Sequence, residues 1–370
     1  MSTRTEIRLL QKAFRQTFDY YRKGALCLVN RALARESIPQ TNLIFVITSG
    51  VCNLACRFCH YSKKSEGKEI SDNTSFARYI EQVGTSGIDH ISLTPMTGEA
   101  MFDKQFPEKV RIIERSNAIR SFEVYSNFIL ASRKHIDGLC ESRKFKSLTI
   151  SVYGHDAQSF SAITQKPAKQ YERLVDNLEY LCTVRDRWPA RTAIGMRHGQ
   201  RFDWTPLQPP SGAESRLQQT IRALCQHAKF EWAGNYTNYD SWNGTITKDD
   251  VRGLDIEIRQ RAAMPKIGAC YMIFDEQAIM PDGRVNACAC RAIDESLIIG
   301  DLNRQPLNEV LSLDNPAYAA LIARQQRGDF PEACRTCTWY KSIYYRKTRG
   351  QDPGYITMQE FRTRKRAVNA

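Results

Sequence analysis

The chain has 370 residues, of which 42% are apolar and 25% charged, a balance typical of a soluble globular protein and not of a disordered one. No run approaches 18 uninterrupted apolar residues, and the first residues lack the apolar core of a secretory signal, so we expect a cytoplasmic protein without a membrane-spanning helix. Of the formal net charge of +13, residues 1–36 carry +5 and residues 338–370 carry +6. This excess at the ends argues against a nucleic-acid-binding stripe and favours solvated ends, with peripheral contact to an anionic membrane surface as the alternative.

An N-terminal extension over residues 1–40 contains apolar residues at helical spacing, before Pro39 breaks the pattern. These positions are Ile7, Leu10, Phe14, Phe18, Tyr21, Leu28 and Ala32. They predict an amphipathic helix. We expect its apolar side to pack on the main domain, and a membrane-surface anchor is the alternative interpretation.

Residues 41–245 alternate short apolar runs with amphipathic stretches. The expected strands are 43–48, 88–93, 122–126, 148–152, 192–196 and 230–232, and the expected helices are 75–83, 106–115, 135–140, 171–184 and 216–227. This order predicts an α/β fold with a parallel sheet that is open or curled towards a barrel. Active sites in such folds lie at the carboxyl ends of the strands, so we expect reactive motifs to follow strands directly.

Three cysteines with C-x₃-C-x₂-C spacing follow the first expected strand, at Cys52, Cys56 and Cys59. Three thiolates can hold three irons of a [4Fe–4S] cluster and leave the fourth iron open to a substrate or cofactor. A zinc ion held by the same cysteines and His60 is the alternative, although zinc sites more often use paired C-x₂-C units.

This motif, with the aromatic Phe58 before its third cysteine, resembles the signature of the radical S-adenosylmethionine (SAM) superfamily. The resemblance extends over about residues 42–240. It implies a partial (β/α)₆ barrel, a SAM-binding [4Fe–4S] cluster, SAM itself and a flavodoxin- or ferredoxin-type reductant. In Thr97-Gly98-Glu99 a threonine replaces the first glycine of the family's motif for the SAM amino group, and the carboxylate is kept. The other implied SAM contacts are Ser126, Asn127, Ser151 and Arg197.

A second cysteine group lies in residues 246–340, at Cys270, Cys288, Cys334 and Cys337. The turn signal at 281–284 predicts a hairpin across which Cys270 and Cys288 can meet. The arrangement resembles the cysteine-rich α+β SPASM/twitch extensions of radical SAM enzymes, which implies an auxiliary [4Fe–4S] cluster. Its spacing is similar to that of the aminocyclitol dehydrogenase of butirosin biosynthesis. A structural zinc ribbon is the alternative, and residues 341–370 are interpreted as a basic tail.

Cys290 has three interpretations: a spare cysteine, another cluster ligand, or a thiol that donates hydrogen to a substrate radical. The last would make the enzyme an epimerase.

Residues near the last expected strands favour a carbohydrate substrate. Aromatic faces stack on sugar C–H surfaces, and amide groups bind hydroxyls. The candidates are Tyr153, His155, Trp232, Asn235 and Tyr236. We therefore predict hydrogen abstraction from a small molecule, namely a sugar, nucleotide sugar or aminocyclitol, that leads to oxidation or epimerisation. A maturase of ribosomally made peptides and a non-catalytic iron–sulfur or zinc protein are the alternatives.

Overall fold

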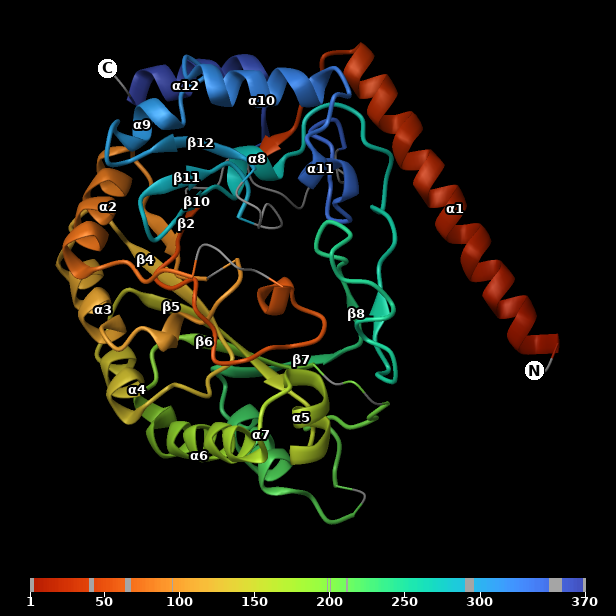
Figure 1. Ribbon diagram of the computed structural model, residues 1–370, viewed down its shortest axis with the longest axis vertical. Coiled ribbons are helices and arrows are strands. Elements are labelled where there is room, and N and C mark those ends of the chain that lie inside the picture. Colours follow the sequence, from red (N-terminus) through yellow and green to blue (C-terminus); the bar gives the residue numbers. More distant parts are fainter. Residues whose placement is uncertain are drawn as a thin grey trace.

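A curved nine-stranded sheet forms the centre of the protein in the computed structural model (Figure 1). The structure describes residues 3–39, 43–63, 68–94, 96–197, 199, 201–210, 212–289, 296–345 and 355–368. The strand order is β12-β11-β10-β2-β3-β4-β5-β6-β7. Six of these strands follow one another in sequence and in space, so that each strand pairs with the next one along the chain.

These six consecutive strands are parallel, as the sequence predicted. The α/β fold with a partial barrel is thereby confirmed. Alternate residues of the strands are buried, as in Leu148, Ile150 and Val152, because helices cover the sheet on its outer side. The strands are β2 (Leu43–Val46), β3 (His90–Ser92), β4 (Ser121–Ser126), β5 (Phe145–Tyr153), β6 (Arg191–Arg197) and β7 (Phe230–Tyr236).

Helices follow the strands and lie around the outside of the sheet (Figure 1). Four of them begin at a side-chain cap, provided by Asp72, Ser132, Asp156 and Ser215. Each cap accepts a hydrogen bond from a free backbone N–H of the first turn and so fixes where the helix begins. The helices are α2 (Asn73–Thr85), α3 (Phe106–Arg115), α4 (Arg133–Cys140), α5 (Ala157–Thr164), α6 (Ala168–Val184) and α7 (Arg216–Cys225), with the 3₁₀ turns η1 (His60–Lys63), η2 (Ala100–Phe102) and η3 (Arg185–Arg187).

The C-terminal region extends the same sheet. Strand β10 (Ala278–Ile279) runs parallel to β2, and β11 (Arg284–Asn286) and β12 (Ile298–Asp301) continue antiparallel. The predicted turn joins β10 to β11, and Gly283 adopts a φ of +92° there, a conformation that favours glycine. The other elements are β8 (Asn238–Tyr239), β9 (Glu257–Ile258), α8 (Met272–Asp275), α9 (Leu307–Val310), α10 (Pro316–Gln326) and α11 (Glu332–Thr336). The boundaries expected between the chain's segments stay predictions.

Strand β1 (Ile38–Pro39), which follows the N-terminal helix, pairs with β13 (Tyr355–Ile356), just before α12 (Met358–Val368). The expected N-terminal amphipathic helix is present as α1 (Thr3–Ala32), which runs along the outer edge of the molecule (Figure 1). The expectation that its apolar side packs on the main domain was wrong: Phe14 and Tyr21 are exposed, whereas the opposite side, with Cys27, makes the contact. Among the described helices, none is both long and apolar enough to cross a membrane.

Candidate functional site

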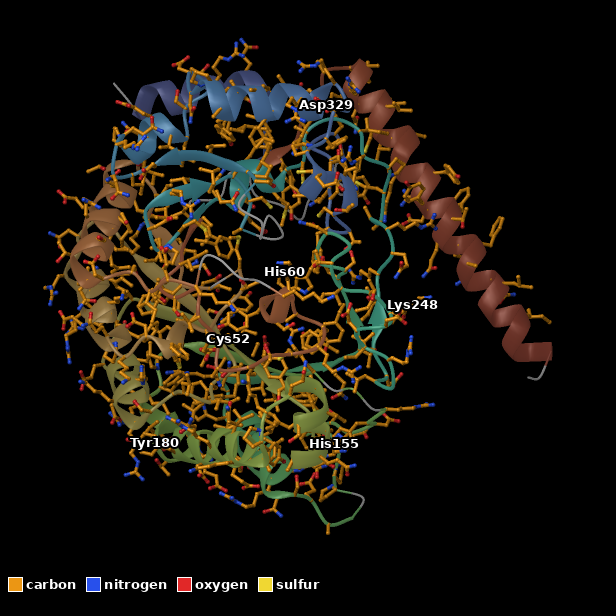
Figure 2. The ribbon with its side chains drawn as sticks, in the orientation of Figure 1. Cys52, His60, His155, Tyr180, Lys248 and Asp329 are labelled. Atoms are coloured by element: carbon orange, nitrogen blue, oxygen red, sulfur yellow. The ribbon has the colours of Figure 1, made fainter. Side chains whose placement is uncertain are left out.

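The first cysteine group lies on the loop that follows β2, at the carboxyl end of the strand. Backbone bonds hold this loop against the end of α5, since the N–H of Ala55 donates to the Thr164 carbonyl at 3.1 Å and that of Arg57 to the Ile163 carbonyl at 3.0 Å. Cys56 is buried, and all three cysteines of the group line one cavity. The scaffold thus fixes the loop while it directs the sulfurs inward (Cys52 is labelled in Figure 2).

Burial makes these thiols difficult to ionise in the protein alone. It raises the pKa of Cys56 well above its ordinary value, and the neighbouring Cys59 and Cys52 raise it further. Burial also raises the pKa of Cys52, and the nearby Glu99 carboxylate adds to the effect. Three crowded sulfurs therefore need a positively charged group between them in order to become thiolates.

The donor set fits an iron–sulfur cluster better than a single zinc ion. The Nδ1 atom of His60 lies 2.9 Å from the Thr245 hydroxyl and is hydrogen-bonded to it. In the described part of the chain, no three His, Cys, Asp or Glu side chains are placed to hold one metal ion. A zinc ion needs its ligands within about 2.3 Å of a single point, whereas the irons of a cluster are spread over several ångströms.

The cavity beside these cysteines has a volume of about 240 Å³ and lies at the carboxyl ends of the parallel strands. The residues expected to bind SAM come from separate loops along the chain, and the structure brings all of them to its wall: Phe58, Gly98, Glu99, Ser126, Asn127, Ser151 and Arg197.

Glu99 is a buried carboxylate at the centre of this wall. The Ser126 hydroxyl donates to its Oε1 at 2.6 Å, and the backbone N–H of Asn127 donates to its Oε2 at 2.7 Å. Burial raises the pKa of Glu99, and these hydrogen bonds counteract part of that rise. Ser126, one of the expected SAM contacts, therefore also fixes the Glu99 carboxylate.

The altered glycine motif still makes a tight turn. Gly98 has a φ of +140°, and a Cβ atom there would lie 2.6 Å from the Ser49 carbonyl oxygen, so glycine is required at this position. The hydroxyl of the adjacent Thr97 is buried and has no hydrogen-bond partner among the described residues. It lines the same cavity, where a ligand with a polar group would satisfy it.

Asn127 connects the wall to the cysteine loop. Its amide nitrogen donates to Asn53 Oδ1 at 2.9 Å and lies 3.9 Å from the Cys52 sulfur. On the other side of the cavity, Arg197 Nε donates to the Ser151 hydroxyl at 3.3 Å. Within the described chain Arg197 forms no ion pair, and its guanidinium lies over the Tyr236 and Tyr239 rings. It therefore has donors available for a carboxylate.

Stacked aromatic rings form the floor of the cavity. Phe58 lies between Tyr153 and Tyr239, with ring centroids 5.9 Å and 4.2 Å away. The Trp242 indole N–H donates to the Phe58 carbonyl at 2.8 Å and so ties the segment after β7 to the cysteine loop. This contact brings residues almost two hundred positions apart into one site.

The substrate candidates divide into two groups. Tyr153 lines the cavity, whereas the other four lie outside its lining. His155 stacks on Phe202 at 4.0 Å, and Figure 2 shows it away from Cys52. Trp232 packs on Trp204, and the Asn235 amide donates to the Trp204 carbonyl. The Arg197 guanidinium lies over the Tyr236 ring.

Sequence reasoning missed several residues of the cavity wall. Asp240 and Tyr125 were not predicted, although Asp240 lies four residues after the candidate Tyr236 and Tyr125 lies within an expected strand. Position directly after a strand would have indicated Thr94 and Met96, which follow β3, whereas nothing local indicated Tyr61.

The second cysteine group also converges. Cys270, Cys288, Cys334 and Cys337 line one small cavity whose other walls are mainly apolar. Burial raises the pKa of Cys334 to about 12, and Cys288 and Cys337 add to this rise. Four sulfurs in an apolar environment suit a fully ligated iron–sulfur cluster. Cys290 lies outside the described residues.

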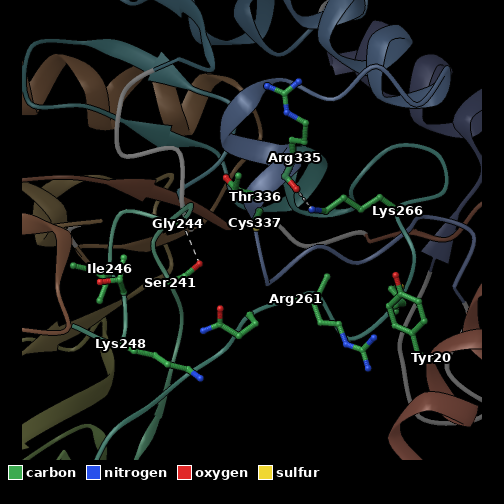
Figure 3. A pocket seen from close by; sticks show the side chains of 14 residues that line it. Tyr20, Ser241, Gly244, Ile246, Lys248, Arg261, Lys266, Arg335, Thr336 and Cys337 are labelled. Atoms are coloured by element: carbon green, nitrogen blue, oxygen red, sulfur yellow. Dashed lines mark hydrogen bonds between the residues drawn. The ribbon is translucent and has the colours of Figure 1, made fainter. Parts of the chain in front are cut away.

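A separate, larger cavity of about 540 Å³ lies beside Cys337 (Figure 3). Lys248, Arg261 and Lys266 line it, and the Lys266 ammonium donates to the Arg335 carbonyl. Burial lowers the pKa of Lys266, and the nearby thiols Cys337 and Cys334 counteract that effect. This cavity gives the region around the second cysteine group a positive surface.

Two sequence families match the chain: the radical SAM superfamily over residues 46–189 and the SPASM iron–sulfur cluster-binding domain over residues 270–338. No curated protein sequence matches. Among solved structures, the chain is similar to BtrN in complex with AdoMet and 2-DOIA, with 13% identity, a TM-score of 0.51, and coverage of 86% of this chain and 100% of BtrN. It is also similar to Streptococcus suis SuiB bound to precursor peptide SuiA, with 14% identity, a TM-score of 0.52, and coverage of 86% and 72%.

These findings confirm the cofactors expected from the cysteine spacing. A radical SAM domain with a SPASM domain binds a [4Fe–4S] cluster, SAM and an auxiliary iron–sulfur cluster. At such low identities the solved structures show the fold alone. The specific relation to an aminocyclitol dehydrogenase therefore stays a hypothesis.

Replacement of Cys56 by alanine should remove one cluster and leave the other. Iron content should fall from about eight to about four per chain if both clusters are of the [4Fe–4S] type, and reductive cleavage of SAM should cease. Cys140→Ala is the matched control, because Cys140 is half-buried in α4 and outside both cysteine groups. Iron analysis and detection of 5′-deoxyadenosine measure the effect; full iron content in Cys56→Ala would contradict it.

Glu99→Gln should weaken SAM binding by roughly 10- to 100-fold, because an amide oxygen accepts a hydrogen bond from the SAM amino group less strongly than a carboxylate does. Burial raises the pKa of Glu99, so its carboxylate becomes protonated at a higher pH than that of an exposed glutamate. The affinity ratio of wild type to variant should therefore shrink towards acid pH. Anaerobic equilibrium dialysis with labelled SAM tests this, and a ratio independent of pH would refute it.

Proposed function

We propose that this radical SAM enzyme with a SPASM domain abstracts hydrogen from a carbon of a carbohydrate or aminocyclitol, with oxidation or epimerisation as the outcome. When bound, the reduced cluster and SAM supply a 5′-deoxyadenosyl radical that takes a hydrogen atom from the substrate, and the auxiliary cluster can accept a second electron. The protein's own residues select the substrate and hold it in place.

The chemistry of the cavity wall supports a polyhydroxylated substrate. Tyr61, Tyr125 and Tyr153 provide aromatic surface, and Asp240 provides a buried carboxylate. Aromatic rings pack on the C–H faces of a sugar or cyclitol, and a carboxylate accepts hydrogen bonds from its hydroxyls. A hydroxyl bonded to Asp240 would have an acceptor for its proton as its carbon is oxidised to a ketone.

One contact carries the proposal of oxidation in particular. The Thr338 hydroxyl lies 3.4 Å from Asp240 Oδ2, and both residues are buried. Asp240 lines the SAM cavity, and Thr338 is adjacent to Cys337 of the second cysteine group. The wall of the first cavity, at Asp240, is thus in direct contact with the loop that carries Cys337. This contact suits the transfer of a second electron from the substrate to the auxiliary cluster.

The positive surface beside Cys337 suits an anionic partner, either a nucleotide-linked substrate or an acidic flavodoxin- or ferredoxin-type reductant.

Asp240→Asn should lower kcat/KM for the substrate by roughly 10- to 100-fold, since a charge-assisted hydrogen bond is replaced by a neutral one. SAM binding should change little, because the SAM contacts lie on other loops. The asparagine keeps an acceptor for the backbone N–H of Trp242, which Asp240 Oδ1 now binds. Steady-state turnover and equilibrium dialysis with SAM together test this. Equal losses of kcat/KM and of SAM affinity would place Asp240 in the SAM site.

Turnover in deuterated water with free, nucleotide-linked and lipid-linked sugars identifies the reaction. Oxidation should give a product two electrons more oxidised, with no solvent deuterium on carbon. Epimerisation should give one carbon-bound deuterium without a redox change. A modified peptide, with no reaction on any sugar or cyclitol, would refute the carbohydrate proposal.

A further inference from the structure

The N-terminal helix α1 carries a stripe of large apolar side chains that faces away from the protein. The stripe consists of Leu10, Phe14, Phe18, Tyr21 and Leu28, whose exposed fractions lie between 57% and 73%. Their spacing of three, four or seven residues places them on one side of the helix, over a length of about 30 Å. A contiguous apolar surface of this size on a folded protein marks an interaction site.

The opposite side of α1 is fixed to the body by specific contacts. A Cβ atom on Gly24 would lie 2.8 Å from the Pro265 side chain, so the helix and the 265 loop touch at this glycine. Cys27 is fully buried, the Asn30 amide donates to the Tyr344 carbonyl at 2.8 Å, and the Arg31 guanidinium donates to the Gln326 carbonyl at 2.7 Å. Rotation of the helix to bury its apolar stripe would break these contacts.

We propose that the apolar stripe of α1 binds the surface of an anionic lipid bilayer and thereby holds the enzyme at the membrane. An amphipathic helix that lies in the interface inserts its apolar side chains among the lipids and keeps its polar side in water. Aromatic residues suit this location, and Phe14, Phe18 and Tyr21 make up much of the stripe. Because the body lies on the opposite side of the helix, a flat membrane can reach the stripe without touching the barrel.

Charge favours a membrane over a second copy of the chain. Residues 1–36 contain eight Lys or Arg against three Asp or Glu. Arg15 and Arg22 each follow a stripe residue by one position and so border the stripe. The Arg22 side chain is 55% exposed and forms an ion pair with Asp19 at 2.7 Å. Two such helices would repel each other, whereas the headgroups of anionic lipids attract each Lys or Arg near the surface.

Vesicle binding by the full chain tests the proposal. The probe is a sedimenting vesicle of phosphatidylcholine and phosphatidylglycerol in equal parts, and vesicles of phosphatidylcholine alone serve for comparison. The wild type should bind the anionic vesicles more tightly, and added salt should weaken this binding. The F14E/F18E variant should bind at least about tenfold more weakly than A13E/Q16E, because it loses two buried aromatic rings.

A13E/Q16E is the matched control, since it makes the same change in net charge at exposed positions outside the stripe. Circular dichroism and iron content confirm that both variants fold. Because these measurements and vesicle binding do not depend on turnover of a sugar, the membrane proposal can fail independently of the proposed function. Equal binding by the two variants would overturn the proposal. Absence of vesicle binding by the wild type would also overturn the proposal. In that case, a dimer seen by sedimentation velocity and abolished in F14E/F18E would instead identify a second copy of the chain as the partner.

Discussion

The function of this protein depends on the parallel pairing of six consecutive strands, because this pairing brings their carboxyl ends to one edge. The loops after β2 to β6 are far apart in sequence, yet they deliver three cysteines, a carboxylate, an amide and a guanidinium to one cavity. A slip of one residue in any strand would turn its side chains to the opposite face. The helices that cover the outer side fix the register, since each strand must bury its apolar side chains against them.

Burial in the barrel has an electrostatic consequence that both cysteine groups share. Thiols and carboxyls that are removed from water resist ionisation, and the site concentrates several of them together. Ionisation of these buried groups therefore requires a positive charge close to them. Iron and the sulfonium of SAM supply it in the barrel, and iron supplies it in the SPASM domain. Glu99 differs from the cysteines, because the protein itself stabilises its carboxylate with hydrogen bonds from Ser126 and Asn127.

The SPASM region is connected to the barrel through backbone as well as side chains. Strand β10 extends the barrel sheet beside β2, the strand that precedes the first cysteine loop. Farther along the chain, Thr338 contacts Asp240 in the wall of the cavity beside the first cysteine group. Two cysteine groups more than 200 residues apart in sequence thus belong to one framework. Such a framework fixes the position of one cysteine group relative to the other.

The sequence determined much of this protein by itself, because cysteine spacing and the alternation of strands and helices are local patterns. The six parallel strands could be predicted from them, as could the convergence of each cysteine group, and of the residues expected to contact SAM, on one cavity. Only the tertiary structure decided the rest. Asp240 contacts Thr338, and Trp232 and Asn235 contact Trp204 outside the cavity lining. These contacts join distant segments of the chain, which no local sequence pattern relates. The periodicity of α1 likewise predicted an apolar side, but which side faces the body was decided by Gly24, Cys27 and Asn30, where close packing and hydrogen bonds fix the helix.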